Sequence, residues 1–218
     1  MQLVILGAPG AGKGTFSQTI KKHKQLNHIA TGDIFRNHIQ KETDLGKIAS
    51  TYIKNGELVP NNITDNLIYS ELNNVKKDFI LDGYPRNLHQ AKKLDEILDE
   101  LNISLTACVS LSIPLEVIVE RLRGRVICSN CAYSYNLKTA PTKIEGICDN
   151  CGGKLVQRKD DSPEIVTHRI KTYERETEPV INYYKEQGKL LEIDCGTVDL
   201  VTQSDEIFDL LLEREARA

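Results

Sequence analysis

A run of small residues near the amino terminus, Gly7-Ala8-Pro9-Gly10-Ala11-Gly12-Lys13-Gly14-Thr15, has the composition of a phosphate-binding loop. Its glycines let successive backbone N–H groups point inward around phosphate oxygens, and Lys13 is spaced to reach the β and γ phosphates of a nucleotide. The usual pattern has Ser or Thr directly after the lysine, whereas Gly14 stands there and Thr15 follows. We expect Gly10 to Thr15 to bind a nucleoside triphosphate; a glycine-rich turn without a ligand is the alternative.

Four of the six cysteines form two pairs, Cys128-x2-Cys131 and Cys148-x2-Cys151. Each C-x2-C turn presents two thiolates to one metal ion, and two such turns supply a tetrahedral site. Because four protein ligands leave no open position, we expect a structural metal, and thiolates favour zinc over magnesium. Disulfides or free thiols are the alternatives, and the spacing does not distinguish zinc from iron. The other two cysteines lie in or beside apolar runs, where we expect core positions.

Short apolar runs alternate with longer amphipathic runs along most of the chain. Leu3–Leu6 is a continuous apolar run, as expected for a strand buried on both faces. Further strands are predicted at 79–81, 105–111 and 190–193. Helices are predicted at about 16–24, from 33, within 44–75 as two or three pieces, and at 88–101, 114–123, 162–187 and 198–216. This alternation predicts an α/β fold, a parallel sheet with helices on both faces.

The segment 124–161 departs from this alternation, because it is rich in cysteine, glycine, asparagine and tyrosine and has no helical period. This composition predicts an inserted β-rich module. Its six basic and four acidic residues are too few and too scattered for a phosphate-tracking stripe.

The overall charge is nearly balanced, with 28 Lys and Arg against 31 Asp and Glu and a net charge of −3. This balance argues against nucleic-acid or membrane partners. No apolar stretch approaches the roughly 18 residues of a membrane span. The first residues lack the basic region of a signal peptide, so we expect a cytoplasmic protein. An Asn-Lys-x-Asp motif is absent from the sequence, which argues against a GTPase.

Two further motifs follow the phosphate loop, Thr31-Gly32-Asp33-Ile34-Phe35-Arg36 and Asp82-Gly83-Tyr84-Pro85-Arg86. In this order and spacing the three motifs resemble the adenylate kinase family, over about residues 1 to 200. The cysteine pairs resemble its long-lid type with a four-cysteine zinc-binding lid. The resemblance implies a P-loop kinase core (1–30, 61–123 and 162–218), a small helical insert that binds a nucleoside monophosphate (31–60) and a zinc lid (124–161). It also implies direct in-line phosphoryl transfer from Mg-ATP to AMP, giving two ADP, with lid closure.

The resemblance assigns the AMP side to residues of the second and third motifs. Arg36 and Arg86 are implied to hold the α-phosphate, which a guanidinium grips in a bidentate fashion. The pocket around AMP is implied to contain Thr31, Glu57, Leu58, Val59, Gly83, Tyr84, Pro85 and Gln90. Asp82 is implied to order the water ligands of Mg²⁺. The alternatives are surface ion pairs for the two arginines and a turn aspartate for Asp82.

Four more arginines lie at or near the two ends of the lid. By resemblance Arg121 and Arg125 serve ATP, and they would share a helix face if the helix extends that far. Arg158 and Arg169 are implied to reach both phosphate chains, and solvated hinge arginines are the alternative. Lys13, Arg86, Arg125, Arg158 and Arg169 are thus the expected catalytic residues. Ser134, Tyr135 and Thr197 are implied to contact ATP.

The sequence is compatible with alternatives for one residue pair and for the function. Asp160 and Asp161 could steer Mg²⁺, pin the closed lid or form a solvated pair. A kinase for UMP or CMP is the nearest rival function, although pyrimidine-specific relatives usually have a short lid. A zinc-ribbon nucleic-acid binder with an ATPase core is the rival from another class. We expect ATP and AMP as partners, no nucleic acid, no membrane, and a monomer.

Overall fold

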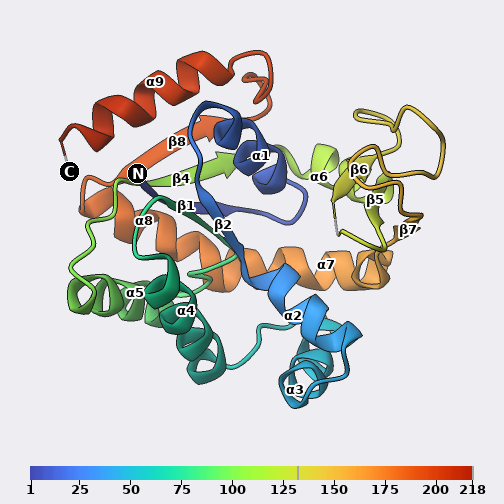
Figure 1. Cartoon of the computed structure of the whole chain (residues 1–218), viewed down its shortest axis with the longest axis horizontal. Coiled ribbons are helices and arrows are strands. Elements are labelled where there is room, and N and C mark those ends of the chain that lie inside the picture. The colour runs from blue at the N-terminus through green and yellow to red at the C-terminus, as the bar shows by residue number, and fades with distance from the viewer. Residues whose placement is uncertain (132, 218) are drawn as a thin grey trace.

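A five-stranded parallel sheet forms the centre of the protein, whose computed structural model describes residues 1–131 and 133–217 (Figure 1). The strand order is β2-β3-β1-β4-β8. The bounds are β1 Gln2–Gly7, β2 Asn27–Ala30, β3 Phe79–Asp82, β4 Ala107–Ser112 and β8 Leu190–Asp194. The predicted α/β fold with a parallel sheet is confirmed.

Helices cover both faces of this sheet (Figure 1). In β1, Leu3 and Ile5 pack into one apolar cluster with α1 (Lys13–His23) and α9 (Ser204–Glu215). Val4 and Leu6 pack into the other, with α4 (Asn61–Val75), α5 (Leu88–Glu100) and α8 (Glu178–Glu186). Successive side chains of a strand point to opposite faces, so a continuous apolar run is what a strand between two helix layers requires. No helix in the described part of the chain is long and apolar enough to cross a membrane.

Two short helices, α2 (Thr31–Gln40) and α3 (Asp44–Ile53), form a small unit with its own apolar cluster. Phe35, Ala49 and Val59 are its buried members. A Cβ atom at Gly46 would lie 2.1 Å from the carbonyl oxygen of His38, so glycine allows α3 to approach the end of α2.

The segment 124–161, which the sequence predicts to be a lid and which is called the lid below, contains a three-stranded antiparallel sheet with the order β6-β5-β7. Its strands are β5 Arg125–Cys128, β6 Ser134–Asn136 and β7 Leu155–Gln157, which confirms the β-rich module. The chain enters the lid from α6 (Leu115–Arg123) and leaves it through the 3₁₀ turn η1 (Lys159–Asp161). It then continues through α7 (Pro163–Thr172) and the π-helical turn η2 (Tyr173–Thr177) into α8. Ser162 caps α7, as its sequence predicts, because its hydroxyl accepts the Ile165 N–H at 3.4 Å.

Several predicted boundaries need correction. Strand β2 was not predicted; it is a short edge strand of which only Ile29 and Ala30 are buried. The last helix begins at Ser204 and not at 198, because the Asp199 carboxylate accepts the N–H groups of two following residues and forms a turn. Arg125 lies on β5, so it does not share a helix face with Arg121.

Candidate active site

A cleft of about 980 Å³ opens at the carboxyl ends of the sheet strands, where α/β sheets bind ligands. The predicted triphosphate residues at its wall are Gly10, Gly12, Lys13, Gly14, Thr15, Arg121, Arg125, Ser134, Tyr135 and Thr197. Asp82 and Pro85 also line it. The side chain of Ala11 is instead packed into the core with α1 and α9.

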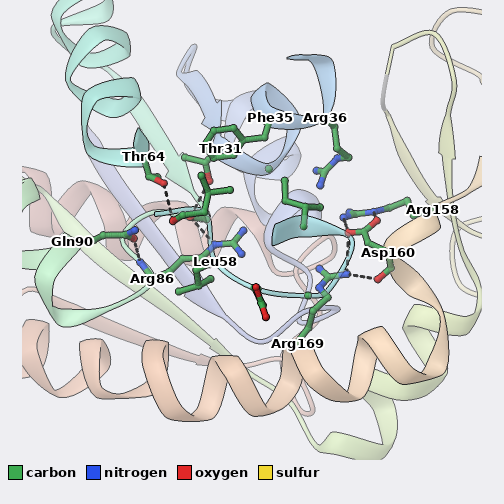
Figure 2. A pocket seen from close by; sticks show the side chains of 16 residues that line it. Thr31, Phe35, Arg36, Leu58, Thr64, Arg86, Gln90, Arg158, Asp160 and Arg169 are labelled. Carbon is green, nitrogen blue, oxygen red and sulfur yellow. Dashed lines mark hydrogen bonds and ion pairs between the residues drawn. The ribbon is translucent and has the colours of Figure 1, made fainter. Parts of the chain in front are cut away.

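A smaller cavity, shown in Figure 2, shares lining residues with the cleft. It is lined by the predicted monophosphate residues Thr31, Arg36, Glu57, Leu58, Val59, Gly83, Arg86, Gln90, Arg158 and Arg169. Four arginines, at 36, 86, 158 and 169, line both spaces, and Figure 2 shows their guanidinium groups directed towards one region beside Leu58. Tyr84 lines neither space; it is fully buried and its hydroxyl donates to Asp65 Oδ1 at 2.8 Å.

The phosphate loop connects β1 to α1, and Lys13 is the first residue of that helix. The Lys13 ammonium curls back along the loop, donating to Gly7 O at 2.7 Å and Ala8 O at 3.1 Å. Gly10 and Gly12 have φ values of 87° and 105°, which side chains other than glycine rarely adopt. Burial lowers the pKa of Lys13 from 10.5 to about 8, an effect that Asp82 opposes and Arg86 reinforces.

Arg86 lies in the loop between β3 and α5. Its backbone N–H donates to Gln90 Oε1 and its Nε donates to Gly83 O, each at 2.8 Å. The Thr31 hydroxyl donates to the same Gly83 oxygen at 2.9 Å. Gly83 has a φ of 82°, and a Cβ there would lie 2.9 Å from both Arg86 Nη2 and Thr31 Oγ1, so the position favours glycine. Arg36, on α2, pairs with Asp33 one turn earlier.

Two aspartates at the base of the lid bind three arginines. Arg125 Nε lies 2.7 Å from Asp161 Oδ2, and Arg169 Nη1 lies 2.9 Å from Asp161 Oδ1 and 3.2 Å from Asp160 Oδ2. Arg158 pairs with Asp160. Both aspartates are buried, so they are not a solvated pair. Burial, reinforced by the charge of Arg158, lowers the pKa of Arg169 to about 9.

Asp82 ends β3 and lines the cleft. Its Oδ2 lies 3.3 Å from His28 Nε2 on the neighbouring strand β2. Burial raises the pKa of Asp82, but the His28 contact and the charge of Lys13 outweigh this and lower it overall. The carboxylate is therefore ionised at neutral pH.

The four paired cysteines come together in the lid as free thiols, with all four Sγ atoms within 4.8 Å of one another. The Cys128–Cys151 and Cys131–Cys148 sulfur distances are 3.4 and 3.6 Å. Tetrahedral zinc with bonds of about 2.3 Å requires sulfur separations of roughly 3.8 Å, so the set fits a four-thiolate metal ion.

Polar donors surround these sulfurs. Asn130 Nδ2 donates to Cys151 Sγ at 3.7 Å, and Asn150 Nδ2 donates to Cys131 Sγ at 3.6 Å. The Tyr135 hydroxyl lies 3.3 Å from Cys148 Sγ. Desolvation raises the pKa of Cys148, but the hydrogen bonds from Tyr135 and from backbone N–H groups outweigh it and lower the pKa to about 6. At Cys148 the thiolate form that a metal needs is thereby favoured.

Sequence reasoning missed some residues of the site. Thr64, on α4, lines the smaller cavity, and Thr177, at the end of η2, lines the cleft and donates from its hydroxyl to Arg86 O. Neither belongs to a recognisable motif, and Thr177 lies 91 residues from its partner. Only the folded chain brings Thr177 to the site.

Comparisons with known proteins agree with this geometry. A family model described as adenylate kinase matches residues 5–189. The chain is 44% identical over 211 residues to an adenylate kinase of Caldanaerobacter subterraneus subsp. tengcongensis, covering 96% of this chain and 93% of the relative. It is 47% identical over 195 residues to an adenylate kinase of Acetivibrio thermocellus, covering 88% and 90%. An adenylate kinase of Staphylococcus epidermidis is 41% identical over 213 residues, covering 97% and 99%.

Proposed function

The chain belongs to the adenylate kinase family, and from this premise we propose which of its residues perform each part of the reaction. The family reaction is the reversible transfer of a phosphoryl group from Mg-ATP to AMP, giving two ADP. The observation that carries the assignment is that four arginines line both the cleft and the smaller cavity. Arginines that line both nucleotide sites mark the place where the two phosphate chains would meet.

ATP occupies the larger cleft in this proposal. The phosphate loop cradles its phosphates through backbone N–H groups, and Lys13 moves from its carbonyl partners to the β and γ phosphates. Arg121 and Arg125, both at the cleft wall, add positive charge from the lid side. Ser134, Tyr135 and Thr197 contact the nucleoside.

AMP occupies the smaller cavity. Arg86 and Arg36 bind its α-phosphate. Hydrogen bonds to Gln90 and Gly83 already orient Arg86. The remaining residues of the cavity surround the nucleoside; they are Thr31, Glu57, Leu58, Val59, Gly83 and Gln90. Pro85, at the wall of the cleft, completes the proposed AMP site. For Tyr84 we propose an indirect role, because its side chain lies in the core and contacts Asp65.

The transfer itself is direct and in line, with no covalent enzyme intermediate. Arg158 and Arg169 contact both phosphate chains and neutralise the charge that gathers between them. Their aspartate partners hold the guanidinium groups in place before the nucleotides arrive. Closure of the lid and of the insert over the nucleotides then excludes water.

Two metal ions complete the proposal. The four lid cysteines hold a structural zinc ion, which the sulfur distances and the surrounding donors support. Mg²⁺ accompanies ATP and, when bound, neutralises charge on its phosphate oxygens. Asp82 would order the water ligands of this ion, a role that suits an ionised carboxylate at the cleft wall.

The division of the chain into a core (1–30, 61–123 and 162–218), an insert (31–60) and a lid (124–161) is part of the same proposal. Separate apolar clusters in the insert and the lid support it. We also propose that the protein is a cytoplasmic monomer without nucleic-acid or membrane partners. Its six free cysteines, all within the described residues, suit a reducing compartment.

The experiment that tests the substrate assignment is a comparison of phosphoryl acceptors. The purified protein is mixed with ATP, Mg²⁺ and each of AMP, CMP, UMP and GMP, and ADP formation is measured. Fast turnover with AMP alone is the expected result. Faster turnover with CMP or UMP would contradict the AMP assignment while keeping the mechanism, and no turnover with any acceptor would contradict the arginine assignments.

A further inference from the structure

We propose that Thr177 is a positioning residue that sets the orientation of Arg86 for the phosphate of AMP. This inference rests on the role proposed above for Arg86. The Thr177 hydroxyl donates to the backbone carbonyl of Arg86 at 2.8 Å, and Thr177 is only 7% exposed. Thr177 lies outside the three nucleotide motifs and the cysteine pairs of the sequence.

Arg86 needs outside partners because its loop, residues 83–87, is neither helix nor strand. Its N–H donates to Gln90 Oε1, from α5, and its C=O accepts from Thr177, from η2. Both backbone groups of Arg86 are thus bound by side chains of two separate helical segments. Fixing the N–H and the C=O of one residue restricts its φ and ψ, and this fixes the direction in which its side chain leaves the backbone.

The local structure explains why the Thr177 hydroxyl is available for this contact. In an α-helix a threonine hydroxyl commonly bonds to a carbonyl three or four residues earlier. Thr177 instead ends a π-helical turn, with φ −98° and ψ −35°. Pro179 follows it closely and has no N–H for an intrahelical bond, which favours such a widened turn. π-helical turns are rare and occur frequently at functional sites.

The contact also connects two phosphate-binding arginines through one helical segment. Arg169 lies on α7, and η2 continues that helix to Thr177. Arg169 is therefore fixed to this segment by its own backbone, and Arg86 is fixed to it by the Thr177 hydroxyl. The segment sets the spacing between an arginine proposed to reach both nucleotides and one proposed to bind AMP.

The first test compares two substitutions of similar shape. Thr177→Val keeps the branched side chain and removes the hydroxyl, whereas Thr177→Ser keeps the hydroxyl and removes the methyl group. We expect Thr177→Val to raise the KM for AMP about tenfold and to change the KM for ATP by less than about twofold. Thr177→Ser should recover most of the AMP affinity. Equal KM values for AMP in the two variants would overturn the proposal.

A matched control separates positioning from a general loss of stability. Thr106 is also buried, and its hydroxyl accepts the Gln2 N–H at 2.9 Å and donates to Gln2 Oε1 at 3.1 Å. It lies just before β4, at the end of the sheet opposite the cleft. Thr106→Val should therefore lower the melting temperature but leave the KM for AMP unchanged. An AMP effect of Thr106→Val equal to that of Thr177→Val would also overturn the proposal.

A double-mutant cycle tests whether Thr177 acts through Arg86. Arg86→Ala alone should weaken AMP binding strongly and raise the KM for AMP. In that background, Thr177→Val should cause no further rise in the KM for AMP. Additive effects would show that Thr177 does not act through Arg86. If Arg86→Ala leaves AMP kinetics unchanged, the role proposed for Arg86 is wrong; if only Arg86→Ala has an effect, the Thr177 inference alone is wrong.

Discussion

Arg125 and Asp161, 36 residues apart, form a two-point ion pair at the base of the lid, with Arg125 Nε 2.7 Å from Oδ2 and Nη2 2.5 Å from Oδ1. The Asp161 side chain is fully buried, and it also accepts from Arg169. One carboxylate therefore joins the first strand of the lid to the helix that leaves it. The Asp161 carboxylate thus holds two of the proposed catalytic guanidinium groups, those of Arg125 and Arg169, before any phosphate reaches them.

Replacement of Asp161 by asparagine should destabilise the protein and reduce its activity. Asp161→Asn keeps the shape of the side chain but leaves Arg125 and Arg169 without their shared carboxylate. Loss of one partner of a buried pair lowers the free energy of unfolding by about 3–5 kcal/mol. Denaturant unfolding and steady-state kinetics on the same preparation would measure both effects.

The control for this variant is Glu120→Gln, because Glu120 pairs with Lys138 at 3.0 Å near the same end of the lid. Both side chains are more than 60% exposed, at 63% and 68%. An exposed pair contributes little, so Glu120→Gln should leave unfolding unchanged. Equal stability of the two variants would contradict the structural role of the buried pair.

Much of the fold is predictable from local sequence patterns. Where the prediction is wrong, the cause is also local. The run Leu3–Leu6 is apolar at every position, and this predicts a strand covered on both faces. Strand β2 lacks the same signal because Asn27 and His28 lie at the sheet edge and are not buried. The composition of residues 198–203 wrongly predicts helix. The Asp199 carboxylate there accepts the N–H groups of the following residues and forms a turn, so the helix begins only at Ser204.

Some residues of the candidate site are likewise predictable from the sequence, and others are not. Lys13 and the cysteine pairs are recognisable because short spacing alone dictates their chemistry. Burial of Asp160 and Asp161 is not predictable, because it depends on arginines that other elements bring to them. Thr177 carries no signal at all, since its only distinguishing feature is a contact made 91 residues away. Contacts between distant segments are what a one-dimensional pattern omits.

Metal removal should affect stability before it affects chemistry. Four protein ligands leave no open position for a substrate, so the metal is structural, and Cys128→Ser or chelation should loosen the lid and lower the melting temperature. Metal analysis of protein purified without chelator should find about one zinc ion per chain. Cys108→Ser is the control: Cys108 is buried in the core outside the cysteine cluster, so this variant should melt earlier yet keep its metal. Absence of metal, or unchanged melting of Cys128→Ser, would contradict the zinc assignment.

Tyr135 should slow the loss of the lid metal. Its hydroxyl accepts the Asp149 N–H at 2.9 Å, so its own proton is free to point at Cys148 Sγ. A donor to a metal-bound thiolate holds the ligand in place, and removal of such partners typically weakens metal binding about 10–100-fold. Tyr135→Phe should therefore release metal to a chromogenic chelator at least about tenfold faster than the unmodified protein.

Tyr133→Phe provides the matched comparison, because the ring of Tyr133 lies 4.8 Å from that of Tyr135. Within the described residues its hydroxyl makes no hydrogen bond, so this variant keeps the aromatic packing and the Cys148 contact. Its release rate should equal that of the unmodified protein. Similar rates for Tyr135→Phe and Tyr133→Phe would show that packing alone, and not the hydroxyl, holds the metal.

Lys13 should give ATP binding and folding stability opposite dependences on pH. Burial lowers its pKa from 10.5 to about 8, so the folded protein releases this proton at a lower pH than the unfolded chain. Between these two values the unfolded chain binds more protons, and the contribution of Lys13 to stability rises with pH. ATP phosphates favour the ammonium form, so ATP affinity should instead fall as the pH rises through about 8.

The same argument predicts proton uptake when ATP binds at about pH 9, where free Lys13 is largely neutral and the phosphates restore its charge. Calorimetric titrations in two buffers of different ionisation enthalpy would measure that uptake. At about pH 7 Lys13 is already protonated and should contribute none. Lys13→Arg keeps a positive charge at both pH values, so it should remove the Lys13 share of the uptake at the higher pH and leave only the share of Arg169, whose pKa is about 9. Uptake that is undiminished in Lys13→Arg would assign the proton to another group and remove Lys13 as its source.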